Sequence, residues 1–458
     1  MDSQAYGRSG DLSSSLYQPL DRERKEMRLL EVSPGNRGEI VKARLIYASL
    51  LNPEDIDYET ISYAWGDATK LDDVNINGRV IDVPASSAAA IKCMRKLDTP
   101  RRLWIDAICI NQDDLAERGH QVSIMSEIYK SSRQNLVYLG EEDETAENAF
   151  DSLRRVYQEI ERKTNGKSGF RTKISQFSRG ETEPIDCEFD EIAINALLKR
   201  EWFKRLWVVQ EVALAPSSIC FCGSKLSIEL VSVIRVLPWL RYHRQTTIDL
   251  MQAVGLWLVV EGKAKWSVCW LMVSTEHFLA SELRDKIFAI AGLVPNPAEN
   301  LRRPDPALIS TDYSKPLSHV YRDATRYAIQ EEGKLNVLQF VRHRCDGDEL
   351  DLGEFPSWVP RLDIPFDKIY DPYPFVSNEF KADSNYQVPG YTIQCNYSGP
   401  ETLSLVGYEV TCIRRASDVF SNTALRSPET CAAILRSIAE QYQTTKKILS
   451  IDEKSRTD

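Results

Sequence analysis

LWIDAICINQDDLAERGHQVSIMSEIYKSSRQNLVYLG, residues 103–140, is the stretch of sequence that decides the fold. It opens with a short apolar run that ends at Asp106, and it closes with a second apolar run from Asn135 to Leu139. Both runs are typical of buried strands. Between them, apolar residues recur at the spacing of an amphipathic helix: Val122, Met125, Ile128 and Tyr129. The stretch therefore predicts a strand, a polar loop, a helix and a second strand.

Polar side chains gather in the loop that follows the first predicted strand: Asp106, Asn111, Gln112 and Asp113. In open α/β sheets, ligands bind at the carboxyl ends of the strands, so this loop is a candidate binding site. The helix after it is expected to begin at Asp114, because Asp114 followed by Glu117 is a start signal of the capping-box type.

The composition indicates a soluble globular protein and argues against several classes of function. The chain has 458 residues, of which 43% are hydrophobic and 27% charged, and its formal net charge is -10. A globally basic nucleic-acid binder is therefore not expected. The five histidines are scattered and the sequence has no HExxH or CxxC motif, so we predict no metal site.

The chain is expected to be cytoplasmic. Its N-terminal residues lack the apolar core of a secretory signal, and no run reaches the roughly 18 apolar residues that a membrane span needs. Ten cysteines in such a chain are expected to stay reduced. Cys220 and Cys222 would share one face of a strand, and we interpret them as thiols of the core.

Strands alternate with helices through the first half of the chain, which predicts an α/β fold with a mostly parallel sheet covered on both faces. Glu59–Tyr63 is a candidate strand, and residues 85–97 are a candidate helix entered through Pro84. A further helix is expected at residues 319–331. Residues 391–397 and 403–410, separated by SGP, predict a hairpin.

These elements divide the chain into five regions. We expect a disordered N-terminus over residues 1–24, an α/β domain over 25–225, a Trp-rich helical region over 226–335, a mixed C-terminal region with the hairpin over 336–440, and a polar tail over 441–458. The α/β domain is interrupted by an insertion at about residues 141–190. The basic middle of that insertion, residues 163–179, is predicted to be a mobile surface loop.

Six blocks of the sequence, in order, resemble the fungal HET domain, named for heterokaryon incompatibility. The first three are YETISYAWGD (Tyr58 to Asp67), the stretch from Leu103 to Gly140, and REWFKRLWVVQEVALA (Arg200 to Ala215). The others resemble the usual sequel in full-length members: RDKIFAIAGLV (Arg284 to Val294), DYSKP (Asp312 to Pro316) and FPSWVPRLD (Phe355 to Asp363). The resemblance covers roughly residues 55–415 and implies a role in fungal self/non-self recognition.

Glu211 is the candidate catalytic residue. It follows Trp207-Val208-Val209-Gln210 in a predicted helix that is apolar on almost every side, where a carboxylate is costly unless it is paired or faces a cleft. Trp207 and Lys204 precede it by four and seven residues, which would place all three along one stripe. The alternative is a structural glutamate paired with Arg200, Lys204 or Arg205.

The order of these elements is also similar to the TIR domain, which implies a TIR-like (flavodoxin-like) core. In TIR domains that cleave NAD, the catalytic glutamate lies on the last helix, four residues after a tryptophan in some members, and Glu211 is the matching position. The loop 107–119 would match the TIR loop that gates the nucleotide cleft. The chain departs from that pattern by the long insertion before Glu211 and by its C-terminal additions.

Eight further residues are candidates for substrate binding: Tyr63, Trp65, Gly66, Asp106, Asn111, Gln112, Arg205 and Trp207. Trp65 could stack on a base or close the end of the sheet, and Gly66 permits a tight turn. Asp106 could hold a ribose hydroxyl or fix the loop through backbone amides. Asn111 and Gln112 could contact amide or phosphate groups or bind the loop internally, and Arg205 could meet a phosphate or pair with a carboxylate.

A rival constellation combines Cys109, His120 and Asp106 as nucleophile, base and orienting acid. The family pattern fixes no histidine at the place of His120, so we favour a buried Cys109 and a surface His120 instead.

Three functions follow from these patterns. The resemblance favours a TIR-like NAD glycohydrolase that releases nicotinamide and ADP-ribose, or cyclic ADP-ribose, uses NAD as substrate without a cofactor, and triggers cell death. The alternative is a non-enzymatic module that signals by self-association or by binding an allelic partner protein. A third is an enzyme that processes another nucleotide in the same cleft.

Overall fold

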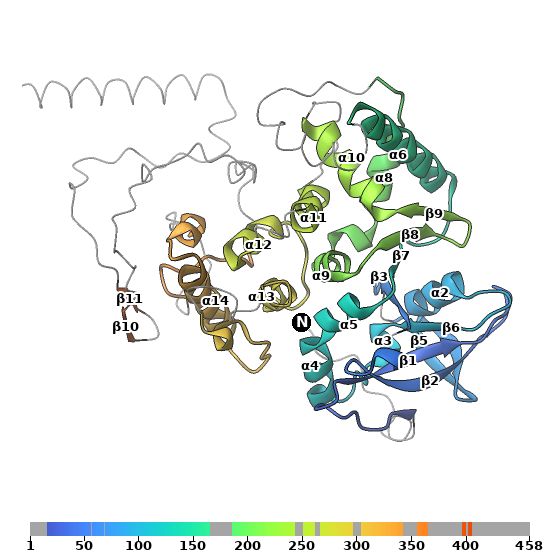
Figure 1. The fold of residues 1–458 in the computed structure, drawn as a ribbon, viewed down its shortest axis with the longest axis horizontal. Coiled ribbons are helices and arrows are strands. Elements are labelled where there is room, and N and C mark those ends of the chain that lie inside the picture. Colours follow the sequence, from blue (N-terminus) through green and yellow to red (C-terminus); the bar gives the residue numbers. More distant parts are fainter. Residues whose placement is uncertain are drawn as a thin grey trace, which may run out of the picture. The chain divides into compact units, whose positions relative to one another are not determined.

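A mixed sheet is the central element of the computed structural model (Figure 1). The structure describes residues 16–55, 57–67, 69–164, 186–242, 251–261, 266–295, 304–341, 355–364, 396–399 and 402–404. The described residues from 16 to 364 belong to one compact unit, and those of the second unit are 396–399 and 402–404. The first unit contains all of the candidate site residues.

In the described part of the first unit, the strands are β1 (Glu26–Val32), β2 (Val41–Ser49), β3 (Glu59–Tyr63), β4 (Leu71–Ile76), β5 (Arg79–Pro84), β6 (Arg101–Trp104), β7 (Asn135–Tyr138), β8 (Ser218–Cys222) and β9 (Leu226–Glu229). They form one sheet in the order β5-β4-β2-β1-β6-β3-β7-β8-β9. The predicted strands at Glu59–Tyr63 and around residues 103–105, 135–139 and 218–222 are confirmed as β3, β6, β7 and β8.

The sheet is mixed, so the prediction of a mostly parallel sheet was wrong. Strands β6, β3, β7 and β8 pair in parallel, and β2 pairs in parallel with β4. Strand β1 is antiparallel to β2 and β6, and two hairpins, β4–β5 and β8–β9, complete the sheet. The β4–β5 turn is Asn77-Gly78, with φ angles of 53° and 83°, the residue pair that a two-residue hairpin favours.

The helices of the α/β part are α2 (Ala85–Met94), α3 (Asp106–Cys109), α4 (Leu115–Ser123), α5 (Met125–Ser131), α6 (Glu144–Lys163), α8 (Glu191–Leu198) and α9 (Val208–Leu214). Side chains alternate along β3: Tyr58 donates to a carbonyl of α5 and Ser62 bonds to α9, whereas Glu59 pairs with Arg101 on the face that carries α2. Both faces of β3 are therefore covered (Figure 1).

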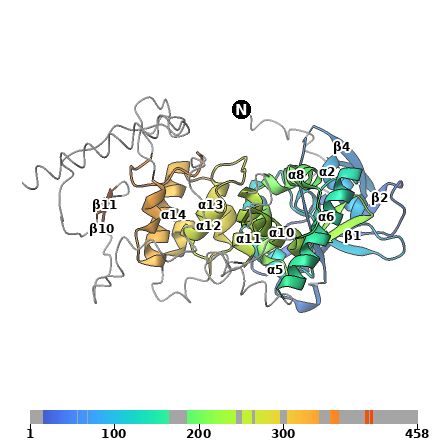
Figure 2. The ribbon, with the colours of Figure 1, turned by 90° about the horizontal axis from the view of Figure 1, so that it is seen from above.

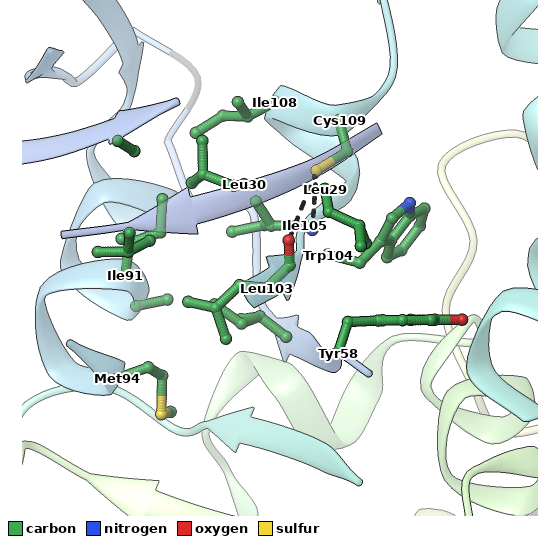
Figure 3. Close-up of a cluster of buried hydrophobic side chains, with 14 of the residues drawn as sticks. Leu29, Leu30, Tyr58, Ile91, Met94, Leu103, Trp104, Ile105, Ile108 and Cys109 are labelled. Atoms are coloured by element: carbon green, nitrogen blue, oxygen red, sulfur yellow. Dashed lines mark hydrogen bonds between the residues drawn. The ribbon is translucent and has the colours of Figure 1, made fainter. Parts of the chain in front are cut away.

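The core lies where β1 and β6 pack against α2 and α3. Leu29, Leu30, Leu103 and Trp104 are all 1% exposed or less, and Figure 3 shows them gathered in one cluster. Cys109 points into the same cluster, where its Sγ accepts from the Ile105 amide at 3.5 Å. This cluster fixes the carboxyl end of β6, from which the candidate loop departs.

The helix after that loop begins where the sequence predicted. The side chain of Asp114 accepts from the amides of Ala116 and Glu117, both at 2.9 Å. Glu117 does not complete a capping box, however, because its carboxylate accepts two bonds from buried Arg28, at 2.6 and 2.9 Å. The predicted single helix is divided into α4 and α5 at Ile124, whose backbone leaves the helical conformation.

Helices pack one after another beyond the sheet, as Figure 2 shows: α10 (Leu230–Tyr242), α11 (Met251–Glu261), α12 (Val268–Ser274), α13 (Asp285–Ala291) and α14 (Leu317–Glu332). Short 3₁₀ turns occupy Pro53–Asp55, Glu201–Lys204, Pro306–Ile309 and Asn336–Phe340. Trp239 and Trp257 are buried in this layer, which confirms the predicted helical layer. The helix predicted at residues 319–331 is confirmed as α14.

Near the N-terminus, the prediction of disorder up to residue 24 was wrong for the described residues. The Tyr17 hydroxyl donates to the carbonyl of Ile108 at 3.1 Å, and the Arg28 guanidinium lies over the Tyr17 ring. In the second unit, β10 (Asn396–Gly399) and β11 (Thr402–Ser404) pair antiparallel, which confirms a hairpin here. The rest of the two predicted strands lies outside the described residues. Most of the predicted surface loop at 163–179 and the polar tail lie outside the described residues.

Candidate functional site

Glu211 lies on α9, but its helix is shorter than the sequence suggested. A 3₁₀ turn (Glu201–Lys204) precedes α9, and Trp207 is the residue at which α9 begins. Lys204 is therefore not on the same helix stripe as Glu211, and its ammonium pairs with Glu201 at 2.5 Å instead. The expected stripe of Lys204, Trp207 and Glu211 was wrong because the chain turns between Lys204 and Trp207.

The Glu211 carboxylate is held at the carboxyl end of β3. The Ser62 hydroxyl donates to its Oε2, and Ser62 in turn accepts from the indole N–H of Trp202 at 2.7 Å. The Arg205 guanidinium lies 4.0 Å from Oε1. Glu211 is only 3% exposed, so these groups and the surrounding protein replace water around its charge.

Burial raises the pKa of Glu211 to about 7, although the charge of Arg205 and the hydrogen bond from Ser62 both oppose this rise. The nearby carboxylate of Asp106 raises the pKa further. Burial also raises the pKa of Tyr63 and of Tyr129, whose hydroxyls share this environment. Near neutral pH the site therefore combines neutral phenols with a carboxyl group that titrates.

Arg205 connects Glu211 to the end of β3. Its guanidinium donates to the carbonyl of Tyr63, and its side chain is 23% exposed. Of the two roles considered for Arg205, the structure forms the pairing with a carboxylate. The distance to Glu211 leaves that pairing weaker than a direct bidentate contact.

Asp106 follows β6 and lies beside the same strand end. Its carboxylate accepts from its neighbour's amide, Ala107, at 2.8 Å and from the indole N–H of Trp65 at 2.9 Å. Asp106 thus fixes the start of the loop, which was one of its two expected roles. The next residue after Trp65, Gly66, has a φ of 66°, a left-handed conformation that makes glycine the fitting residue for this turn.

Asn111 and Gln112 bind the loop internally. The side-chain amide of Gln112 donates to the backbone carbonyl of Asp106 at 2.9 Å. The Asn111 side-chain oxygen Oδ1 accepts from the backbone amide of Asp113 at 3.3 Å. The amide of Asn111 donates to Glu117 at 2.8 Å, which ties the loop to the buried Arg28–Glu117 pair. The loop is therefore held from both of its ends.

Three of the candidates line one pocket of about 140 Å³. Trp65, Asn111 and Gln112 lie around it together with Tyr17, Asp82 and Asp113. Glu211, Tyr63, Asp106 and Arg205 form a second, more buried group that does not line this pocket. The bond between Trp65 and Asp106 joins the two groups.

The indole N–H of Trp207 donates to a residue outside both groups. Its acceptor is the carboxylate of Asp285, at 2.9 Å. The sequence analysis missed Asp285, and also Ser62 and Trp202, which hold Glu211. Ser62 carries little signal, since the strand Glu59–Tyr63 also contains the polar residues Glu59 and Thr60. Trp202 carries none beyond its place in a conspicuous block.

Comparison with known proteins identifies the region that contains this site. The family model of the heterokaryon incompatibility protein (HET) domain matches residues 58–211, from the residue before β3 to Glu211 itself. The chain is a HET-domain protein. It is 26% identical, over 425 residues, to heterokaryon incompatibility protein 6, OR allele, of Neurospora crassa. That match covers 79% of this chain and 61% of the relative, so the chain spans about three fifths of its length. No solved structure matches.

Every candidate residue lies inside the matched HET domain, whereas Asp285 lies outside it. Within the described residues, no group of three or more His, Cys, Asp or Glu side chains could hold a metal ion. No helix in the described part of the chain is long and apolar enough to cross a membrane.

The rival constellation in the HET domain is contradicted. Cys109 is fully buried, and burial raises the pKa of its thiol to about 12, so it is not a thiolate near neutral pH. Its Sγ contacts the backbone of Leu103 and Ile105 rather than His120. Cys220 and Cys222 are buried free thiols, as predicted.

Proposed function

We propose that this HET-domain protein acts in fungal non-self recognition and programmed cell death as a TIR-like NAD glycohydrolase with Glu211 as its catalytic carboxylate. The observation that carries the proposal is the state of Glu211. It is a buried carboxylate at the carboxyl end of a parallel strand, with a pKa raised to about 7 by burial. Strongly perturbed carboxylates at such positions are typical of functional sites.

The chemistry suits a single carboxylate. Cleavage breaks the bond between the ribose C1′ and the nicotinamide nitrogen, and the electron pair leaves with nicotinamide, which becomes neutral. No acid has to protonate this leaving group. The ribose carbon becomes electron-poor, as in glycoside hydrolysis, and a carboxylate in a site of low dielectric stabilises it. Water then adds to C1′ and gives up a proton to solvent to form ADP-ribose. Alternatively, a nitrogen of the adenine ring adds to C1′ and adenine gives up a proton, which forms cyclic ADP-ribose.

In the proposed function, a substrate reaches Glu211 by displacing the partly exposed residues near the carboxyl end of β3. Asp106 and Arg205 are half-buried, and Gly66 is exposed beside them. Because Arg205 lies 4.0 Å from Glu211, a turn toward a phosphate would break its hydrogen bond to the Tyr63 carbonyl but no bidentate pair with Glu211. When NAD binds, Arg205 would move away from Glu211, and the ribose of the substrate would take its place beside the carboxylate.

One observation favours a second function. Glu211 is only 3% exposed and already accepts a hydrogen bond from Ser62, as expected of a glutamate that only stabilises the fold. In that case the HET domain is a non-enzymatic module that signals by self-association or by binding an allelic partner. The Neurospora crassa relative is named as one allele, OR, of an incompatibility protein, which supports an allelic partner for either function.

The test is nicotinamide release from NAD by the full chain over a range of protein concentrations. Wild type is expected to release nicotinamide, and Glu211→Gln is expected to lose transition-state stabilisation on the order of 3 kcal/mol, a rate loss of at least about 100-fold. Asp190→Asn, which keeps an N-capping side chain at the start of α8, is the matched control. Equal rates for wild type and Glu211→Gln would remove the enzymatic proposal and favour the non-enzymatic module.

A further inference from the structure

A buried carboxylate outside the HET match binds Trp207, the N-cap residue of the Glu211 helix. Asp285, the first residue of α13, accepts from the Trp207 indole at 2.9 Å through one carboxylate oxygen. Its other oxygen accepts from the Tyr313 hydroxyl at 2.7 Å. Asp285 is 9% exposed, and burial raises the pKa of its carboxyl group while these two donors oppose the rise. Both oxygens are therefore committed to partners from distant parts of the chain.

Tyr313 is itself fixed by α13. Its ring makes an edge contact with Phe288, with ring centroids 4.9 Å apart. The guanidinium of Arg284 donates to the carbonyl of Tyr313 and forms a two-bond pair with Glu282, at 2.8 Å for each bond. Two downstream sequence blocks, around Asp285 and around Tyr313, are thus bound into one rigid support for Trp207.

The backbone beside Arg205 is held by the same support. The amide of Leu206 donates to the carbonyl of Leu279 at 3.0 Å, and the amide of Leu279 donates to the carbonyl of Lys204 at 2.6 Å. These bonds bracket Arg205, which pairs with Leu279 as in a parallel sheet. At the other end of α13, Gly292 lies so close to Gln210 that an added Cβ would fall 2.0 Å from its amide nitrogen.

We propose that Asp285 is a positioning residue for the reaction at Glu211. It acts through Trp207, and residues 279–292 together with Tyr313 set the geometry between Arg205 and Glu211. This inference rests on the proposed function for its effect on catalysis. Its structural part, that Asp285 restrains residues 205–211, does not depend on any activity. A displacement of α13 would therefore reach Glu211 through the bond between Asp285 and Trp207.

The experiment compares three variants of the full chain. Asp285→Asn keeps the size of the side chain but removes its charge, and Tyr313→Phe removes only one of the two donors to Asp285. Asp312→Asn is the matched control, since Asp312 is the neighbour of Tyr313 and bonds only to Ser314 and within its own turn. Each variant is measured for hydrogen exchange of residues 205–214, for melting temperature, and for kcat and KM with NAD.

We expect Asp285→Asn to raise hydrogen exchange in residues 205–214 while exchange in β1 and β2 stays at the wild-type rate. Its kcat should fall roughly 10- to 100-fold with KM within about twofold of wild type, because misplacement of a reacting group affects the chemical step. Tyr313→Phe should show a smaller change of the same kind, and Asp312→Asn should match wild type. A general loss of structure would instead lower the melting temperature and raise exchange throughout the sheet.

Unchanged exchange of residues 205–214 in both Asp285→Asn and Tyr313→Phe would overturn the proposal. So would a fall in kcat for Asp312→Asn equal to that of Asp285→Asn. If Asp285→Asn does not fold, Tyr313→Phe decides by the same measurements. A wild-type chain that cleaves no NAD overturns the function proposed above, whereas the restraint of residues 205–211 by Asp285 is then decided by the exchange result alone.

Discussion

The two ends of β3 each hold a buried glutamate, and the two glutamates are in opposite states. Glu59, at the amino end, is 1% exposed and bonds to the Arg101 guanidinium at 2.9 Å, with Arg133 3.2 Å away. Burial acts to raise its pKa, but the bonds from Arg101 and Gln134 outweigh burial and lower the pKa to about 2. Glu211, at the carboxyl end, is 3% exposed and has a pKa of about 7.

Both carboxylates are shielded from solvent, but Glu211 lies deeper in the protein, so burial outweighs its partners there, whereas the partners of Glu59 outweigh burial. Glu59 has two arginines and an amide, whereas Glu211 has one hydroxyl and one arginine at 4.0 Å. A carboxylate with complete partners stabilises the fold, and one with incomplete partners is left ready to interact with a cationic substrate. The carboxyl end of β3 is where α/β sheets place their ligands.

The largest expected effect is on the structural end of β3. Glu59→Ala should lower the free energy of unfolding by about 3–5 kcal/mol, because it leaves Arg101 buried beside no carboxylate. Urea denaturation at pH 7 measures this loss. Since the pKa of Glu59 is lowered in the folded state, its contribution is present above about pH 4.5 and disappears as the pH falls toward 2.

The control for this prediction is Glu127→Ala, which removes a partly exposed ion pair with Lys25. Its loss should stay within about 1 kcal/mol. Equal losses for Glu59→Ala and Glu127→Ala at pH 7 would contradict the structural role given to the amino end of β3.

A smaller effect is expected at the carboxyl end. Ser62→Ala removes the donor to Glu211 and the acceptor of the Trp202 indole, and should cost about 1–3 kcal/mol of unfolding free energy. It should also raise the pKa of Glu211 further and move the pH dependence of NAD cleavage to higher pH. Thr60→Val is the matched variant, because Thr60 lies on the same face of β3 and bonds to Asn135 instead.

Ser62→Ala and Thr60→Val should lose similar amounts of unfolding free energy, but only Ser62→Ala should shift the pH profile of NAD cleavage. That result would support the role of Ser62 as the donor to Glu211. The same pH profile in Ser62→Ala, Thr60→Val and wild type would show that Ser62 does not influence the reacting group. Denaturation and nicotinamide release on the same preparations give both quantities.

The smallest effect concerns the rejected constellation around Cys109. His120→Ala should leave nicotinamide release within about twofold of wild type and the unfolding free energy within about 0.5 kcal/mol, because His120 is half-exposed and Cys109 faces the core. A loss of more than about tenfold in the rate of nicotinamide release would show that His120 takes part in the reaction.

The fold could be predicted from the sequence where the pattern was strong. The apolar runs of β3, β6 and β7, the N-cap at Asp114 and helix α14 all followed from spacing and capping. The hairpin of β4 and β5 was missed because both strands mix polar with apolar residues, although Asn77-Gly78 marks their turn. An edge hairpin with one exposed face leaves little apolar pattern to detect.

The site was predictable only in part. Glu211 was found because a carboxylate among apolar helix residues requires a reason. Its partners were not, since Ser62 and Glu211 are 149 positions apart and only tertiary packing brings them together. Glu117 was misinterpreted as a capping glutamate for the same reason, because its partner Arg28 lies on β1.

The pH dependence of kcat/KM for NAD tests the central claim most directly, because it reports the ionisation of the essential group in the free enzyme. If ionised Glu211 is that group, kcat/KM should rise with pH and level off above an apparent pKa of about 7, and Glu211→Gln should lack this rise. A plateau already reached near pH 5, as an ordinary glutamate would give, would contradict the account.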